Sequence, residues 1–155
     1  MAWKILLALA FSAAFLFGCC NLSYNPSSGG TGAPQSFGDL KQDAQVSNSV
    51  SYWRGEARPI AMLEYAVSAD GIGSFTLQNT DATGTLTING IEIAGKAFKE
   101  AVALQPGETK RVEASGLPAG GKGGLYKFDA KITYTTPNGV QATQYGAKPI
   151  VGRYS

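Results

Sequence analysis

The chain has 155 residues, which suits one domain of ordinary size, and its charged fraction of 15% is well below the usual quarter. Few charges with 20 glycines are common in secreted β-rich proteins, while 44% hydrophobic residues excludes a chain too polar to build a core. A net charge of +2 without a basic stripe argues against nucleic-acid binding, and the lack of histidine removes the commonest general base and metal ligand.

The N-terminal segment has the layout of a secretory signal peptide. Lys4 precedes an apolar run over 5–17, which is shorter than the roughly 20 residues of a membrane-spanning helix but fits a signal-peptide core of about 7 to 15. The pattern predicts a signal peptide over 1–18. The alternative is a hydrophobic helix that is retained.

The chain's two cysteines, Cys19 and Cys20, directly follow this apolar run. Neighbouring Cα atoms lie about 3.8 Å apart, closer than a normal disulfide needs. Leu16-Phe17-Gly18-Cys19 resembles the lipobox of prokaryotic lipoproteins. The resemblance implies that Cys19 becomes the N-terminus, carries lipid on its sulfur and anchors the protein to the outside face of the cell membrane. Cys20 is either a second acylation site or a bystander.

Residues 19–50 are predicted to form the lipidated N-terminus and a flexible tether. They are rich in Ser, Gly, Asn, Gln and Pro and hold few large apolar residues. Such a composition buries too little surface to order itself, so no helix is expected here.

Residues 51–155 alternate short strand patterns with turn signals. Strands are predicted at 59–67, 72–78, 85–95, 98–104, 109–115, 125–136 and 140–145, and the clearest is 125–136. Its alternate residues Tyr126, Phe128, Ala130, Ile132 and Tyr134 are expected to face a core. The fold class is therefore all-β: a single antiparallel immunoglobulin-like β-sandwich of about six to eight strands.

Two Asn-Gly pairs carry local predictions. Asn138-Gly139 is the favoured pair for a two-residue type I′ hairpin. Asn89-Gly90 either turns a tight hairpin or forms a bulge in one long strand; the bulge is favoured because the hairpin arms would be very short. The C-terminal KPIVGRYS either begins a final strand or pairs with another copy.

No pattern in the sequence indicates catalysis. Glu56 with Glu64, or Asp70 with Asp81, are conceivable carboxylate pairs, but each is expected to be an ordinary exposed strand or turn residue. The chain has neither the alternating acids of a calcium loop nor the cysteine spacing of a zinc site, and GGKGG lacks the full phosphate-loop pattern. We therefore expect no enzyme activity, no metal and no cofactor.

One cluster, Tyr52, Trp53 and Arg54, is a candidate ligand or partner surface. The aromatic pair would serve as a stacking platform, or alternatively as a core plug between tether and sandwich.

Residues 50–155 also resemble the surface β-sandwich domains of archaeal type IV pilin-like and related cell-surface proteins. The resemblance is carried by YWRGEARPIAMLEY, FTLQNTDATGTLTINGIEI, LQPGETKRV and GLYKFDAKITYTTPNG. It implies an extracellular, structural or adhesive role. The chain departs from a pilin at its N-terminus, where Asn21, Pro26 and the glycines would break a long helix.

The sequence thus predicts a lipid-anchored cell-surface protein with a non-catalytic β-sandwich that acts in binding, adhesion or envelope structure. Its partners would be membrane lipid through Cys19, a protein or glycan, and a second copy through an edge strand. The alternative is an extracellular filament subunit whose N-terminal hydrophobic helix is retained and packs in the filament core.

Overall fold

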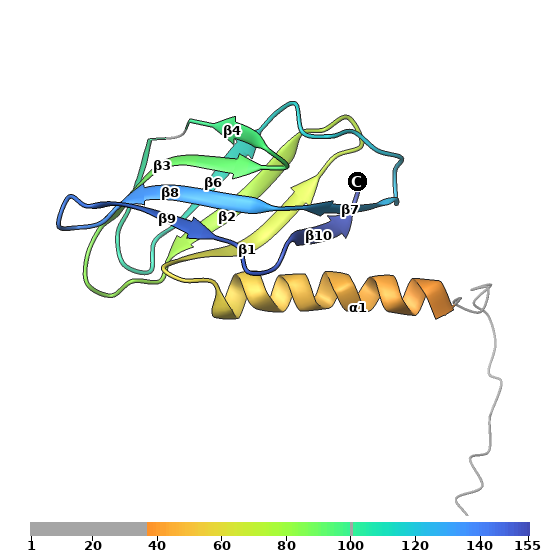
Figure 1. The fold of residues 1–155 in the computed structure, drawn as a ribbon, viewed down its shortest axis with the longest axis horizontal. Coiled ribbons are helices and arrows are strands. Elements are labelled where there is room, and N and C mark those ends of the chain that lie inside the picture. The colour runs from red at the N-terminus through yellow and green to blue at the C-terminus, as the bar shows by residue number, and fades with distance from the viewer. Residues whose placement is uncertain (1–36, 100) are drawn as a thin grey trace, which may run out of the picture. The chain divides into compact units, whose positions relative to one another are not determined.

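The computed structural model describes residues 37–99 and 101–155. The predicted signal peptide, Cys19 and residues 19–36 of the predicted tether lie outside the described residues, and what the sequence indicates for them stays a prediction. Within the described residues the chain is mostly β-sheet, with ten strands in three antiparallel sheets (Figure 1).

The first sheet has three strands in the order β1-β2-β6, which are β1 (Ile60–Val67), β2 (Gly73–Asn79) and β6 (Thr109–Ala114). β2 alternates buried and half-buried residues along its whole length, with Phe75 and Leu77 on the core side. This period of two follows from the pleat of a strand that has one face on the core. The strands predicted at 59–67, 72–78 and 109–115 are therefore confirmed, with small shifts at their ends.

The second sheet has five strands, centred on β3 (Leu86–Ile93) and β8 (Ala130–Thr135). Its other members pair with these two and are β4 (Lys96–Phe98), β5 (Val102–Leu104) and β9 (Gln141–Tyr145). The register of β3 against β8 shifts between Ile88 and Gly90, so the Asn89-Gly90 bulge is confirmed within one strand.

The third sheet pairs β7 (Leu125–Phe128) with β10 (Ile150–Arg153). The strand predicted at 125–136 is therefore two strands that part at Asp129, although its predicted inward residues from Tyr126 to Tyr134 are all buried. Because β10 pairs with β7 of the same chain, KPIVGRYS supplies a final strand of the domain itself.

The β8–β9 hairpin is confirmed, but the two-residue type I′ turn is wrong. The N–H of Gly139 donates to the carbonyl of Thr136 (2.9 Å), which makes a turn over 136–139 with Pro137 at its second position. Gly139 has a φ of +78°, and Asn138 is not among the residues with positive φ, as a type I′ turn would require. The chain instead uses a type I-like turn followed by a left-handed glycine.

Helix α1 (Phe37–Ser51) corrects the prediction of a flexible tether for residues 37–50. It is followed without interruption by the π-helix η1 (Tyr52–Glu56), so the described part of the chain also contains helical structure where none was expected. Figure 1 shows α1 beside β10, in agreement with the hydrogen bonds between them. The helix is ordered by these tertiary contacts rather than by its own composition.

One hydrophobic core serves all three sheets and η1. Its fully buried members include Leu77 of β2, Ile88 of β3, Ile132 of β8, Ile150 of β10 and Trp53 of η1. The sheets are also joined at their edges through β1. The side-chain amide of Gln144 in β9 accepts a hydrogen bond from Ile60 N–H (2.9 Å) and donates one to Ile60 C=O (2.8 Å).

Candidate functional site

The predicted Tyr52–Trp53 platform is part of the core. Trp53 is 0% exposed and Tyr52 is 9% exposed, and their rings meet edge to face at 5.3 Å and 78°. Neither ring face is open for stacking on a ligand. The pair matches the alternative of a core plug, because η1 inserts both rings beneath the segment 146–149 that links β9 to β10.

Arg54 is exposed, and its Nε donates a hydrogen bond to the carbonyl of Leu63 in β1. The three predicted residues therefore do not form one surface. Their structural effect is to fix η1 against β1 and against the 146–149 segment.

Tyr52 also contacts the 146–149 segment through its hydroxyl and its ring. Its hydroxyl oxygen accepts a hydrogen bond from the backbone N–H of Ala147 (2.8 Å), and the ammonium of Lys148 lies 5.8 Å from the centre of its ring. Cation–π attraction at this distance holds the lysine near the ring while its head stays in solvent. The 146–149 segment is thus tied to η1 at two successive residues.

Ser49 fastens the C-terminal half of α1 to β10. Its hydroxyl donates to Pro149 C=O (2.7 Å) and accepts from Val151 N–H (3.0 Å), and it lies 2.8 Å from the hydroxyl of Tyr65 in β1. Burial raises the pKa of Tyr65 above its usual value, against the opposing effect of its hydrogen bonds to Ser49 and Val151. One buried serine therefore connects a helix and two strands.

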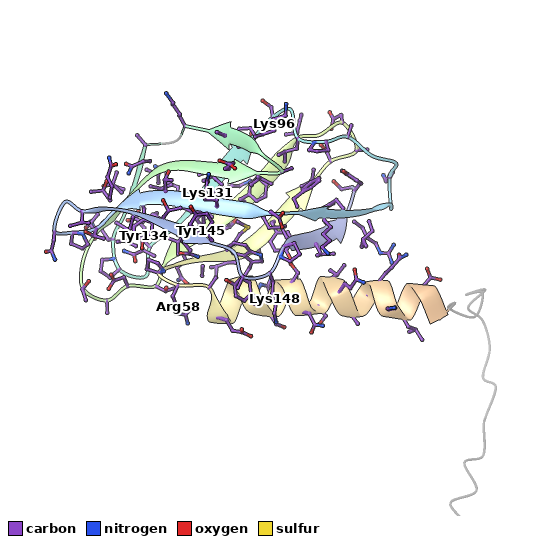
Figure 2. All side chains as sticks on the ribbon, viewed as in Figure 1. Arg58, Lys96, Lys131, Tyr134, Tyr145 and Lys148 are labelled. Carbon is purple, nitrogen blue, oxygen red and sulfur yellow. The ribbon has the colours of Figure 1, made fainter. Side chains whose placement is uncertain are left out.

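A pocket of about 230 Å³ lies where α1, β7 and the start of β10 meet. Helix α1 lines one side of the pocket with Gln45, Asn48 and Ser49. The other side is lined by two lysines and two apolar residues, which are Lys127, Lys148, Pro149 and Val151. Figure 2 labels Lys148 beside the C-terminal half of α1. We call this hollow the α1–β10 pocket and treat it as the candidate binding site.

The α1–β10 pocket carries positive charge. Its lining includes Lys127 and Lys148 but no aspartate or glutamate. Asp43, two residues before Gln45 on α1, is held by Arg153 of β10 in an ion pair of 3.0 Å. Asp43 is therefore neutralised by a cation outside the pocket lining, and the charged residues of the lining itself are two lysines.

The α1–β10 pocket could not be predicted from the sequence, because its residues come from distant parts of the chain. Lys127 lies opposite Val151 in the β7–β10 register, and α1 covers the same face through Ser49. The one local signal is Lys148-Pro149, where the chain leaves β9 and starts β10 after a break in the strand pattern.

A second polar surface lies on the outer face of the five-stranded sheet. Lys131 of β8 pairs with Glu92 of β3 (2.5 Å), and this hydrogen bond raises the pKa of Lys131. Tyr145 of β9 lies opposite Lys131 in register and is 72% exposed (Figure 2). The lysine charge is balanced by its partner here, in contrast to the α1–β10 pocket.

The conceivable carboxylate pairs are not built as pairs. Asp81 accepts hydrogen bonds from the hydroxyl (2.7 Å) and the N–H (2.8 Å) of Thr83, which lower the pKa of Asp81. Asp70 accepts from the Ser68 hydroxyl in another turn. Glu56 and Glu64 are exposed, at the end of η1 and in β1. Each acid of the two pairs thus has the turn or surface position expected for it.

Among residues 37–99 and 101–155, no group of three His, Cys, Asp or Glu side chains is placed to hold a metal ion. No helix in this described part of the chain is long and apolar enough to cross a membrane. No protein-family model matches the sequence, and a search of curated proteins found no significant match.

Proposed function

We propose that the chain is a membrane-anchored cell-surface protein whose non-catalytic β-sandwich acts in binding, adhesion or envelope structure. The anchor rests on the sequence, where Cys19 follows an apolar run and a lipobox-like LFGC. Two or more acyl chains on Cys19 would give stable anchoring, since a single chain gives only marginal membrane binding.

We also propose that the β-rich domain has an immunoglobulin-like fold. The three-stranded and five-stranded antiparallel sheets share one core, which supports a two-layer sandwich. The described domain has no cysteine, so its stability depends on this core and on polar links between the layers such as Gln144. A domain of this kind suits display outside the cell without dependence on redox state.

The observation that carries the binding role is the α1–β10 pocket. Two lysines and two side-chain amides line the same hollow, on a frame fixed by Ser49 and Tyr52. Concave sites with a few convergent polar groups are the usual form of ligand sites in proteins. A protein or a glycan remains the predicted partner.

The alternative is a pilin-like filament subunit that keeps its N-terminal hydrophobic helix. The observation that favours it is α1 itself, since a helix joined rigidly to the domain replaces the flexible tether that the sequence predicted. Self-association through an edge strand also stays a prediction. β6 is the outer strand of the three-stranded sheet, and its exposed Lys110, Arg111 and Glu113 are the kind of charged residues that discourage edge pairing.

The anchor is tested by metabolic labelling of cells with an alkyne fatty acid, on the Cys19→Ala variant and on Cys20→Ala as the matched control. The proposal expects no label on Cys19→Ala, because the lipid attachment point is gone, and label on Cys20→Ala. Membrane retention is not the readout, since an unprocessed Cys19→Ala chain would keep its apolar segment over 5–17. Label retained on Cys19→Ala, or absent from the parent, would contradict lipid attachment at Cys19.

A further inference from the structure

The α1–β10 pocket has three kinds of lining that together define a ligand class. Lys127 and Lys148 supply ammonium groups, and Pro149 and Val151 supply an apolar wall. Gln45 and Asn48 lie one helical turn apart on α1, so their amides face the same side of the helix. Each amide can donate and accept hydrogen bonds, as a pair of neighbouring hydroxyl groups requires.

We propose that this pocket binds a carboxylate-bearing sugar, such as a uronic acid unit of an acidic polysaccharide. The lysines would pair with the carboxylate, the amides with hydroxyl groups, and the apolar wall with the C–H face of the ring. This inference rests on the proposed binding role and names the ligand class of the same site.

The charge pattern supports an anion over a neutral ligand. Among residues 37–99 and 101–155, neither lysine of the pocket has an ion-pair partner, and the lining contains no acid. A bound carboxylate would therefore meet two cations that no carboxylate of the protein already occupies. Asp129, two residues beyond Lys127 on the chain, belongs to a different hollow, beside Lys131 and Tyr145.

The size of the pocket favours a single sugar ring. The lining contains no arginine, and two lysine ammonium groups attract a carboxylate and a phosphate alike, so the titration with each probe distinguishes the two anions. Arg153 of β10 lies outside the lining and is held by Asp43 and by the carbonyl of Gly123. The volume of about 230 Å³ is below the usual 300 Å³ of drug-sized sites, which fits one sugar ring rather than a larger group.

The test is calorimetric titration of the full chain, in neutral detergent, with oligogalacturonate, and with maltooligosaccharide as the neutral probe. The proposal expects binding of oligogalacturonate only. The double variant Lys127→Gln/Lys148→Gln should weaken it about tenfold, because two charge-assisted contacts are lost. The matched control is Lys96→Gln/Lys110→Gln, which removes the same charge from β4 and β6 and should bind like the parent (Figure 2 labels Lys96).

A second variant, Asn48→Asp, places an acid in the pocket at an exposed helix position and should weaken binding without loss of the folded signal in circular dichroism. An equal loss in both lysine double variants would overturn the proposal, since it would show attraction to net charge alone. Binding of glycerol 3-phosphate but not of oligogalacturonate would also overturn it, in favour of a lipid headgroup.

The outcome is distinguishable from a failure of the proposed function. Pocket-dependent binding of maltooligosaccharide would overturn the ligand class and leave the surface-binding role standing. Loss of lipid anchoring is measured separately on Cys19→Ala and does not depend on any sugar.

Discussion

At the level of single residues, two buried side-chain amides form hydrogen bonds with backbone groups that have no backbone partner on that side. Gln144 is 7% exposed and fills both hydrogen-bonding positions of Ile60, as a neighbouring strand would. Asn79 is fully buried and donates to the carbonyls of Gly84 and Leu104 while accepting from Asp81 N–H. Both follow the rule that buried polar groups are paired, and both join segments that no strand pairing connects.

Replacing Gln144 with leucine should lower the free energy of unfolding by about 2–4 kcal/mol. The change leaves the N–H and C=O of Ile60 buried without partners, and each unsatisfied group costs about 1–3 kcal/mol. Urea denaturation measures the loss. Gln141→Leu, at an exposed position of the same strand, is the control and should change stability by less than about 0.5 kcal/mol. Equal effects of the two variants would contradict the structural role of the Gln144 amide.

Tyr126 gives the domain a pH dependence in the alkaline range. Burial, with smaller contributions from Tyr65 and Tyr154, raises the pKa of Tyr126 to about 12. In the unfolded chain the group ionises near pH 10, so between about pH 10 and 12 the unfolded state loses its proton first. The folded state then holds more protons than the unfolded state, and stability falls as the pH rises.

Urea denaturation at pH 9 and pH 11.5 tests this dependence. The parent should lose stability over the interval, and Tyr126→Phe should lose less because the titrating group is gone. Tyr145→Phe, on the exposed face of β9, is the control and should follow the parent. Parallel curves for the parent and Tyr126→Phe would show that another group sets the alkaline limit.

At the scale of elements, the key feature is a long hairpin that is interrupted in the middle. β7 and β8 form one arm, and β9 and β10 form the other. The N–H of Gly146 still donates to Ala130 C=O (3.0 Å), and the chain leaves the ladder over 147–149. The interruption lets Trp53 approach the backbone, because a Cβ on Gly146 would lie 2.4 Å from Cζ2 of the Trp53 ring. It also places Lys148 at the rim of the α1–β10 pocket.

Gly146→Ala should therefore destabilise the domain by about 1–3 kcal/mol, the usual cost of overpacking a core. Either the Trp53 ring or the 146–149 backbone must shift, and both are held in place. Gly121→Ala is the control, since a Cβ there meets nothing within 4 Å. Thermal denaturation compares the two variants, and an unchanged melting temperature for Gly146→Ala would contradict the close packing of Trp53.

The same scale shows what could be predicted from the sequence. The strands could be predicted because the alternation of apolar and polar residues, as in Phe75–Leu77 or Tyr126–Tyr134, is a local signal of a half-buried strand. Helix α1 could not be predicted, because Ser47, Asn48 and Ser49 are weak helix formers and few apolar residues mark its buried face. Its order comes from hydrogen bonds of Ser49 to β10, which no local pattern reveals.

The candidate site could not be predicted from the sequence either, because it depends on tertiary contacts that no local pattern reveals. Lys127 and Lys148 each occupy an ordinary polar position in the sequence, and only the β7–β10 register and the docking of α1 bring them to one pocket. The aromatic residues that the sequence indicates, Tyr52 and Trp53, lie against the 146–149 segment, which supplies Lys148 to that pocket. The sequence pointed to the correct region of the fold but to its core rather than its surface.

At the scale of the whole molecule, a β-rich domain follows an N-terminal segment that carries both cysteines of the chain. The C-terminus is tied into this domain, since Ser155 N–H donates to Val67 C=O (3.1 Å) and Ser155 C=O accepts from Ala69 N–H (3.1 Å). The domain's contacts to anything outside itself are proposed to run through the α1–β10 pocket, and its attachment to the cell through Cys19.

Lipid attachment at Cys19 fixes the mature N-terminus of the protein, which can be measured. Intact-mass spectrometry and N-terminal peptide mapping of protein extracted from membranes should find a chain that begins at Cys19 and carries acyl chains on that residue. A chain that begins at Met1 or Ile5 in purified filaments would contradict lipid anchoring, because the hydrophobic segment would then be retained as a filament helix.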